Sequence, residues 1–144
     1  MSVAAKLLPL FVQVALTLVL LVRLAAMRLQ AVRRGEVKFD PRFAITGDHW
    51  PTRIRQSSNA FANQFEIPVL FYTAMVLGLV VNAIDFLFIV FAWVFVVSRL
   101  LHAAVHVTSN DVGWRFPVFA VGVVAVVVLW VMIALHVFVS GALA

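Results

Sequence analysis

The sequence contains no cysteine among its 144 residues. This absence excludes disulfides, thiolate metal sites and a cysteine nucleophile. Charge is also scarce, because charged residues make up 12% of the chain while hydrophobic residues make up 65%. Together with a mean hydropathy of +1.09, this composition excludes an ordinary soluble domain and indicates an integral membrane protein.

Four apolar runs are each close to the ~20 residues that a helix needs to cross a bilayer. In lipid the backbone must satisfy its own hydrogen bonds, so runs of this length are expected to be helices, whereas barrel strands would be about half as long. The sequence therefore predicts an all-α integral membrane four-helix bundle, a single domain over residues 1–144. The predicted spans are residues 7–29, 61–81, 86–107 and 116–140.

Positive charge is concentrated between the first two spans, where residues 33–55 include six Lys and Arg. The turn at residues 82–85 and the C-terminus carry none, so the positive-inside rule places the first and third loops in the cytoplasm and both termini on the non-cytoplasmic side. We expect the first run to be a retained span. The basic residues that give the net charge of +5 flank the spans and form no nucleic-acid recognition motif. We therefore expect membrane lipids and no nucleic acid as partners.

Glu66 and Arg99 lie well inside the second and third runs. An ionisable group at that depth needs a partner and is a candidate for a functional site. Two asparagines precede the glutamate and two histidines follow the arginine, all at helical spacing. When the glutamate and the asparagines are each paired with the arginine or one of the histidines, the two residue numbers of every pair add up to the same value. This pattern predicts an antiparallel hairpin folded about Asn82 and Ala83, in which Glu66 and Arg99 form a buried ion pair. The predicted rungs are Asn59/His106, Asn63/His102 and Glu66/Arg99.

The polar residues of each helix fall within a narrow arc at about 100° per residue, so both stripes are expected to face protein. We predict a polar cleft between them that opens toward the cytoplasm, with Arg115 as a further cation at the start of the fourth run. Pro68 cannot donate a hydrogen bond to the carbonyl of Gln64. A kink beside Glu66 is therefore expected.

The polar stripe has three interpretations. It could be structural, with an ion pair and amides that fasten the helices together. The two histidines at i and i+4 could hold a metal or haem, but no carboxylate shares their rung and no third ligand is evident, so we predict no metal site. Arginine and histidine donors beside asparagine amides suit an anionic, amide-rich ligand that enters from the cytoplasm.

Three short motifs follow one another along the chain: the run Asn59-Ala-Phe-Ala-Asn63-Gln-Phe-Glu66-Ile-Pro68, the run Arg99-Leu-Leu-His102, and Arg115. Together with four spans and a basic first loop, they resemble the MAPEG family of membrane-associated proteins in eicosanoid and glutathione metabolism. The resemblance covers the whole chain. It implies a homotrimer that holds glutathione between neighbouring subunits, near the cytoplasmic side of a bacterial inner membrane.

The resemblance also implies roles for individual residues. Family members bind glutathione through residues that match Asn63, Glu66, Arg99 and His102, to which we add Asn59 and His106. The arginine that matches Arg115 stabilises the glutathione thiolate, because a nearby cation raises the fraction of the nucleophilic form. The implied function is a glutathione-dependent transferase or peroxidase, with glutathione as co-substrate and a lipophilic small molecule as the electrophile.

The sequence also departs from the family pattern. The eicosanoid enzymes of the family carry arginine where this chain has Asn59 and Ala62, and tyrosine where it has His106. Two cations that would hold the glutathione carboxylates are therefore missing. Because the family also contains a lipid-binding member without catalytic activity, a non-catalytic lipid-binding or scaffold protein is the alternative to an enzyme.

Overall fold

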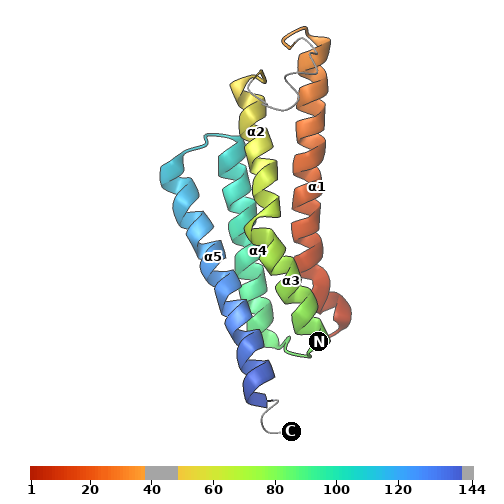
Figure 1. Ribbon diagram of the computed structural model, residues 1–144, viewed down its shortest axis with the longest axis vertical. Helices are drawn as coiled ribbons and strands as arrows, with labels where there is room; N and C mark the ends of the chain where they lie inside the picture. The colour runs from red at the N-terminus through yellow and green to blue at the C-terminus, as the bar shows by residue number, and fades with distance from the viewer. Residues whose placement is uncertain (38–48, 141–144) are drawn as a thin grey trace.

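The computed structural model describes residues 1–37 and 49–140. Its described residues form helices and no strand, and four helical segments are long and apolar enough to span a membrane. The all-α, four-span prediction is therefore confirmed. In chain order (Figure 1), the elements are α1 (Val3–Arg33), α2 (Thr52–Ala62), the 3-10 turn η2 (Asn63–Phe65), α3 (Ile67–Val80), α4 (Phe86–Val107), α5 (Val112–Leu135) and the π-helical turn η3 (His136–Ser140).

The third span has the predicted bounds, but the other helices begin earlier than their apolar runs. Polar caps explain part of this difference, because they lie outside the apolar runs. Ser2 accepts a hydrogen bond from the amide of Ala5 at 3.2 Å and so caps the start of α1. Asp111 accepts from the amide of Gly113 at 2.8 Å and caps α5. Capping side chains satisfy amides that the first turn of a helix leaves without partners.

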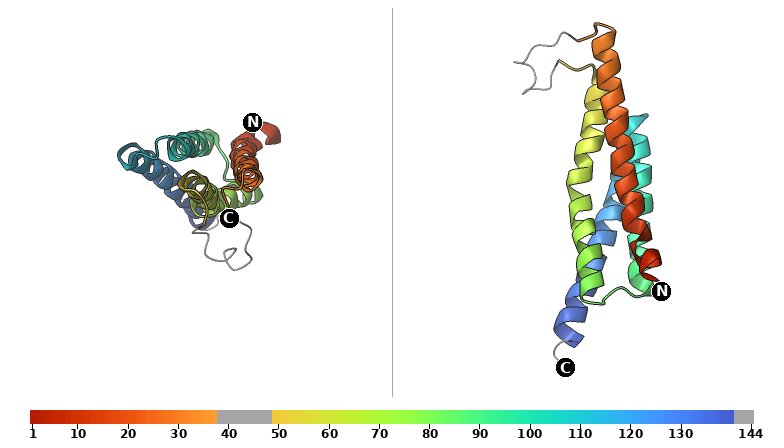
Figure 2. Two further views of the ribbon diagram at one scale, coloured as in Figure 1. Left: turned by 90° about the horizontal axis from the view of Figure 1, so that it is seen from above. Right: turned by 90° about the vertical axis from the view of Figure 1, so that its right-hand side faces the viewer.

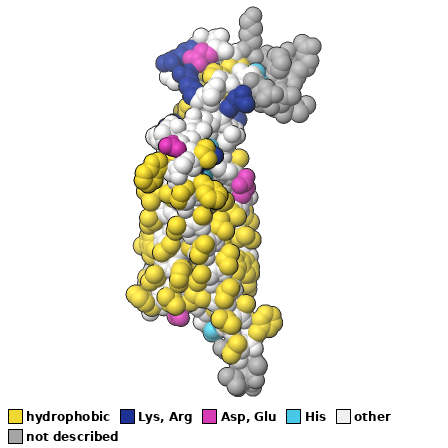
Figure 3. Space-filling view, turned by 90° about the vertical axis from the view of Figure 1, so that its left-hand side faces the viewer, with side chains coloured by type: hydrophobic (Ala, Val, Ile, Leu, Met, Phe, Trp, Pro, Cys, Tyr) yellow, Lys and Arg dark blue, Asp and Glu magenta, His cyan; other side chains and the backbone are white. Residues whose placement is uncertain are grey.

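The spans run antiparallel, so that the start of α1, the α3–α4 turn and the end of α5 lie together at what we call the hairpin end (Figures 1 and 2). The opposite end, which we call the loop end, holds the last turn of α1, the first turn of α2 and the α4–α5 turn. The space-filling view shows an apolar belt along the bundle, with Lys and Arg gathered at the loop end (Figure 3). The placement of the termini outside the cytoplasm stays a prediction.

The second span is broken where the proline motif predicts a kink. Glu66 has φ −100° and ψ −107° between η2 and α3, and Pro68 lies in the first turn of α3. At this break the buried Gln64 side chain donates to the carbonyl of Ala60 and accepts from the amide of Gln13 on α1, both at 3.0 Å. The break is thereby tied to α1 in the middle of the bundle.

Helices α4 and α5 have the most extensive helix contact in the bundle. Gly122 of α5 lies against Ser98 of α4, and a Cβ atom at Gly122 would stand 2.4 Å from the serine Oγ. Beside this contact the rings of Phe71 and Phe95 stack with centroids 4.4 Å apart, which joins α3 to α4. The close approach of α4 and α5 therefore depends on a small residue at position 122, as is common between membrane helices.

This contact gives a test of the packing. Gly122→Ala should lower the free energy of unfolding by about 1–3 kcal/mol, because the added methyl group overpacks the α4–α5 contact. Ser98→Ala removes the clashing oxygen, so the double variant Gly122→Ala/Ser98→Ala should regain most of the loss. Thermal unfolding in detergent measures all three variants. Equal melting temperatures for Gly122→Ala and the double variant would show that the two side chains do not meet.

Candidate functional site

Arg99 is the buried centre of the polar cluster. Its side chain is 1% exposed, and its Nη2 donates to the backbone carbonyl of Asn63 at 3.1 Å. Asn63 follows the last residue of α2, where the end of an α-helix leaves carbonyls without α-helical partners. The guanidinium carbon also lies 5.8 Å from the ring centroid of Phe119 on α5. The break in the second span therefore supplies the acceptor for a charge that would otherwise lie among apolar side chains.

The side chain of Asn63 extends this contact to a histidine. Its Nδ2 lies 3.3 Å from Nδ1 of His106. Because an amide NH2 group only donates, Nδ1 of the neutral imidazole is the acceptor in this arrangement and Nε2 carries the proton. Gln56, two turns earlier on α2, donates to the carbonyls of His106 at 2.5 Å and Thr108 at 3.2 Å. These bonds fix α2 against the last turn of α4.

His102 and Arg115 complete the cluster. The ring of His102 lies 5.7 Å from that of His106 and 5.6 Å from that of Phe119, and its Nδ1 is buried without a hydrogen-bond partner among the described residues. Arg115 is half-buried and donates to Oδ1 of Asn110. The cluster is thus rich in donors and carries positive charge.

The predicted ion pair between Glu66 and Arg99 is wrong. Glu66 is exposed on the single chain, and the ion pairs within residues 1–37 and 49–140 join other residues. The prediction assumed a continuous helix, whereas a 3-10 turn and a non-helical Glu66 rotate the carboxylate away from the polar arc. Glu66 remains near enough to attract the charge of Arg99.

The predicted rungs are also shifted. Asn63 contacts His106, one turn further along α4 than the predicted His102, and Asn59 is exposed with no side-chain hydrogen bond in the described part of the chain. Helices α2 and α4 are antiparallel as predicted. The predicted register was wrong because it required both spans to be uninterrupted helices. The overwound turn at the break moves the amides relative to the histidines.

The cluster has two layers instead of an open cleft. Arg99, His102 and His106 form the buried layer, and none of them is more than 4% exposed. In front of them Asn63 and Arg115 are half-buried, while Asn59 and Glu66 are exposed. Arg99 and His106 of the buried layer therefore orient Asn63, which a ligand could reach. No cluster of three His, Asp or Glu that could hold a metal occurs among the described residues.

The sequence prediction missed several polar residues that build this region. Gln13 and Gln64 form the buried amide pair at the break, and Gln56 fastens α2 to α4. Gln13 lies inside the first apolar run, so the rule that singled out Glu66 and Arg99 would have selected it only if extended from ionisable to uncharged polar residues. No comparable signal identifies Phe119, which is one of many aromatic residues in the spans.

The two-layer arrangement predicts that stability depends strongly on Arg99 and only slightly on Glu66. Arg99→Met leaves a buried carbonyl without its donor and should lower the free energy of unfolding by roughly 1–3 kcal/mol. Glu66→Gln changes an exposed side chain and should stay within about 0.5 kcal/mol of the wild type. Thermal unfolding in the same detergent compares both variants. An equal loss of stability in both variants would indicate a buried ion pair between Glu66 and Arg99 and would contradict the two-layer arrangement.

Comparison with known proteins bears on the whole chain. No curated protein and no solved structure matches the sequence significantly. The model of the MAPEG family matches residues 6–135. This range is nearly the whole chain and includes every predicted site residue. The chain therefore belongs to the MAPEG family.

Proposed function

We propose that this protein is a glutathione-dependent membrane transferase or peroxidase that acts on a lipophilic electrophile. Membership of the MAPEG family, which includes glutathione transferases and peroxidases, supports this class of activity. The observation that carries the proposal is the hydrogen-bond chain in which Arg99 and His106 fix Asn63 from behind. A fixed amide together with an exposed carboxylate and a half-buried arginine suits a zwitterionic peptide with a thiol.

The accessible groups match the chemistry of glutathione. The carboxylate of Glu66 suits the ammonium group of the peptide, and the amides of Asn59 and Asn63 suit its peptide bonds. From the buried layer, Arg99 and His106 hold Asn63, and Arg99 supplies positive charge near an anionic ligand. His102 adds a buried ring nitrogen that has no partner among the described residues. A preorganised layer of this kind limits the entropy lost when a flexible peptide binds.

Arg115 is the proposed catalytic residue. It begins the fourth span at the loop end, where its bond to Asn110 directs the guanidinium. Placed beside the sulfur, this cation stabilises the thiolate over the thiol and so increases the nucleophile at neutral pH. The thiolate then forms a bond to the electrophilic carbon of the acceptor while the leaving group departs with its electron pair. No covalent bond to the enzyme is needed, since positioning and local charge lower the barrier.

Exposure in the single chain favours a shared site. Glu66 lies at the break inside the second span, and a carboxylate at that depth is costly when it faces lipid. A neighbouring copy that covers the break would bury this carboxylate and enclose the peptide. We therefore propose a homotrimer with the peptide between subunits, in a bacterial inner membrane with the loop end in the cytoplasm.

A second candidate is a non-catalytic lipid-binding or scaffold protein. One observation favours it: a groove of about 590 Å³ runs along α4 and α5 and is lined almost entirely by apolar side chains, including Phe86, Trp93, Leu101 and Val121. The missing family cations at Asn59 and Ala62 point the same way. The two candidates differ in whether the protein binds glutathione.

Calorimetric titration of the detergent-purified protein with glutathione separates the two candidates. An enzyme should bind the peptide in the micromolar to millimolar range, because the donor-rich cluster is preorganised. Glu66→Gln should weaken binding by removing the partner of the ammonium group. No heat change at several millimolar glutathione would favour the lipid-binding candidate.

The role of Arg115 is tested by the thiolate itself. Stopped-flow absorbance should show thiolate formation when glutathione meets the wild type, and a much smaller signal with Arg115→Ala, because the stabilising cation is lost. Turnover of chlorodinitrobenzene should fall in parallel, while calorimetric binding is largely kept. Arg33→Ala, which removes an exposed arginine from α1, is the charge control and should resemble the wild type. Equal thiolate signals in Arg115→Ala and the wild type would refute the assignment.

A further inference from the structure

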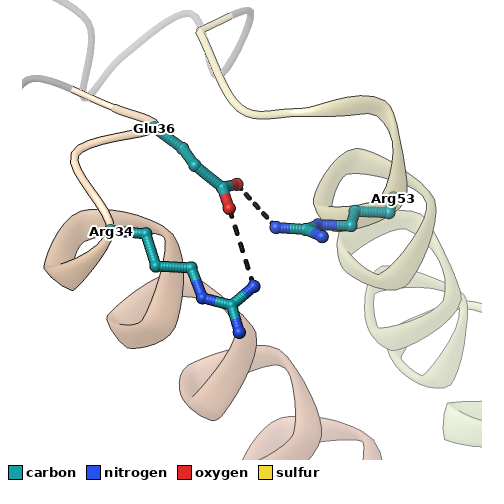
Figure 4. Close-up of polar contacts among 3 residues, drawn as sticks. All are labelled: Arg34, Glu36 and Arg53. Atoms are coloured by element: carbon teal, nitrogen blue, oxygen red, sulfur yellow. Dashed lines mark hydrogen bonds and ion pairs between the residues drawn. The ribbon is translucent and has the colours of Figure 1, made fainter.

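The arginines at the loop end differ in whether a carboxylate neutralises them. Glu36 pairs with Arg34 at 3.9 Å and with Arg53 at 2.5 Å, so one carboxylate joins the end of α1 to the start of α2 (Figure 4). Arg28 lies about one and a half turns before Arg34 on α1, and it has no carboxylate partner in the described part of the chain. Its positive charge is therefore not balanced within residues 1–37 and 49–140.

Arg28 is nevertheless held in place. Its Nη2 donates to Oγ of Ser58 on α2 at 3.3 Å, and its guanidinium carbon lies 5.3 Å from the ring centroid of Trp50. Its Nε is buried and has no acceptor among the described residues. The guanidinium is thus oriented by a hydroxyl and an aromatic ring, neither of which carries negative charge. An arginine in this state retains donors for an anion.

An apolar crevice begins at this arginine. It has a volume of about 500 Å³ between α1 and α2. On α1 the lining positions repeat at the i, i+3, i+4 and i+7 spacing of one helix face. On the other wall, Phe61 of α2 and Phe65 of η2 contact each other edge to face with centroids 5.1 Å apart. From Arg28 to Leu21 the crevice follows α1 for about 10 Å toward the hairpin end. Its lining is Leu21, Leu24, Ala25, Arg28, Ser58, Phe61, Ala62 and Phe65.

The crevice is separate from the polar cluster around Arg99. At about 100° per residue, Ser58 and Phe61 lie on one face of α2, roughly 100° or more around the helix from Asn59. The crevice opens between α2 and α1, whereas the cluster lies between α2 and α4. A ligand in the crevice would therefore not occupy the peptide site.

We propose that this crevice binds one anionic phospholipid, with its phosphodiester on Arg28 and Ser58 and an acyl chain along the apolar wall. The planar fork of arginine matches phosphate oxygens, and tryptophan beside it is typical of the head-group level of a membrane. Because no carboxylate among the described residues pairs with Arg28, the site selects an anionic head group. The site does not depend on glutathione or on catalysis.

Native mass spectrometry of the full-length protein in detergent tests this inference. With phosphatidylglycerol, the wild type should retain one lipid per chain, and Arg28→Gln should weaken retention about tenfold or more, because hydrogen bonds to a charged group are lost. Arg28→Lys keeps the charge without the fork and should be intermediate. Arg33→Gln removes one positive charge at the same end and should behave like the wild type. Ala25→Phe should reduce binding by filling the crevice without changing the charge.

The comparison ligands identify which chemistry is recognised. Phosphatidylcholine should bind more weakly than phosphatidylglycerol, and inorganic phosphate alone should not raise the melting temperature. Equal effects of Arg28→Gln and Arg33→Gln would show that the lipid is attracted only by the general surface charge, and would overturn the site. Tighter binding of oleate, or stabilisation by phosphate alone, would also contradict a phospholipid.

The absence of cysteine allows a check on another occupant. Ala25→Cys places the only thiol of the chain in the crevice. Lipid occupancy predicts that it stays uncrosslinked between copies and is protected from a maleimide when phosphatidylglycerol is added. An intermolecular disulfide in high yield would show that a second copy covers the crevice and would overturn the proposal.

Discussion

A buried arginine in a membrane-spanning helix needs hydrogen-bond acceptors, and this requirement organises the bundle. Arg99 lies in a largely apolar stretch of α4, and it finds its acceptor in the backbone of Asn63. That carbonyl is within reach because the second span is interrupted beside Pro68. The helix break is therefore what allows a cation to be buried there, and the cation in turn stabilises the break.

The same break connects stability to chemistry. Its backbone is held by Arg99 from α4, and its side-chain amides are held by Gln13 from α1 and His106 from α4. These contacts leave Glu66 exposed next to an oriented Asn63. A local interruption, which would be costly in lipid if unsupported, thus becomes a rigid polar surface inside the apolar belt. This surface is where the proposed peptide site lies.

The four spans could be predicted from the sequence because a span is determined by the length of an apolar run with few charged residues. Helix α4 begins and ends at the predicted residues. The sequence was also sufficient to select Asn63, Arg99, His102 and His106, since polar residues inside apolar runs are conspicuous. It failed for Glu66 and the rungs because both were derived from ideal helical spacing across Pro68. A proline indicates a break but does not determine how far the chain rotates there, which depends on contacts with α1 and α4.

Hydrogen–deuterium exchange at the break tests most directly whether Arg99 supports it. The account predicts that residues 63–69 are protected in the wild type and exchange much faster in Arg99→Met, while the hairpin end of α4 keeps its protection. Glu66→Gln serves as the matched control and should leave the exchange of this segment unchanged. Unaltered protection of residues 63–69 in Arg99→Met would contradict the account, because the break would then be held without the buried cation.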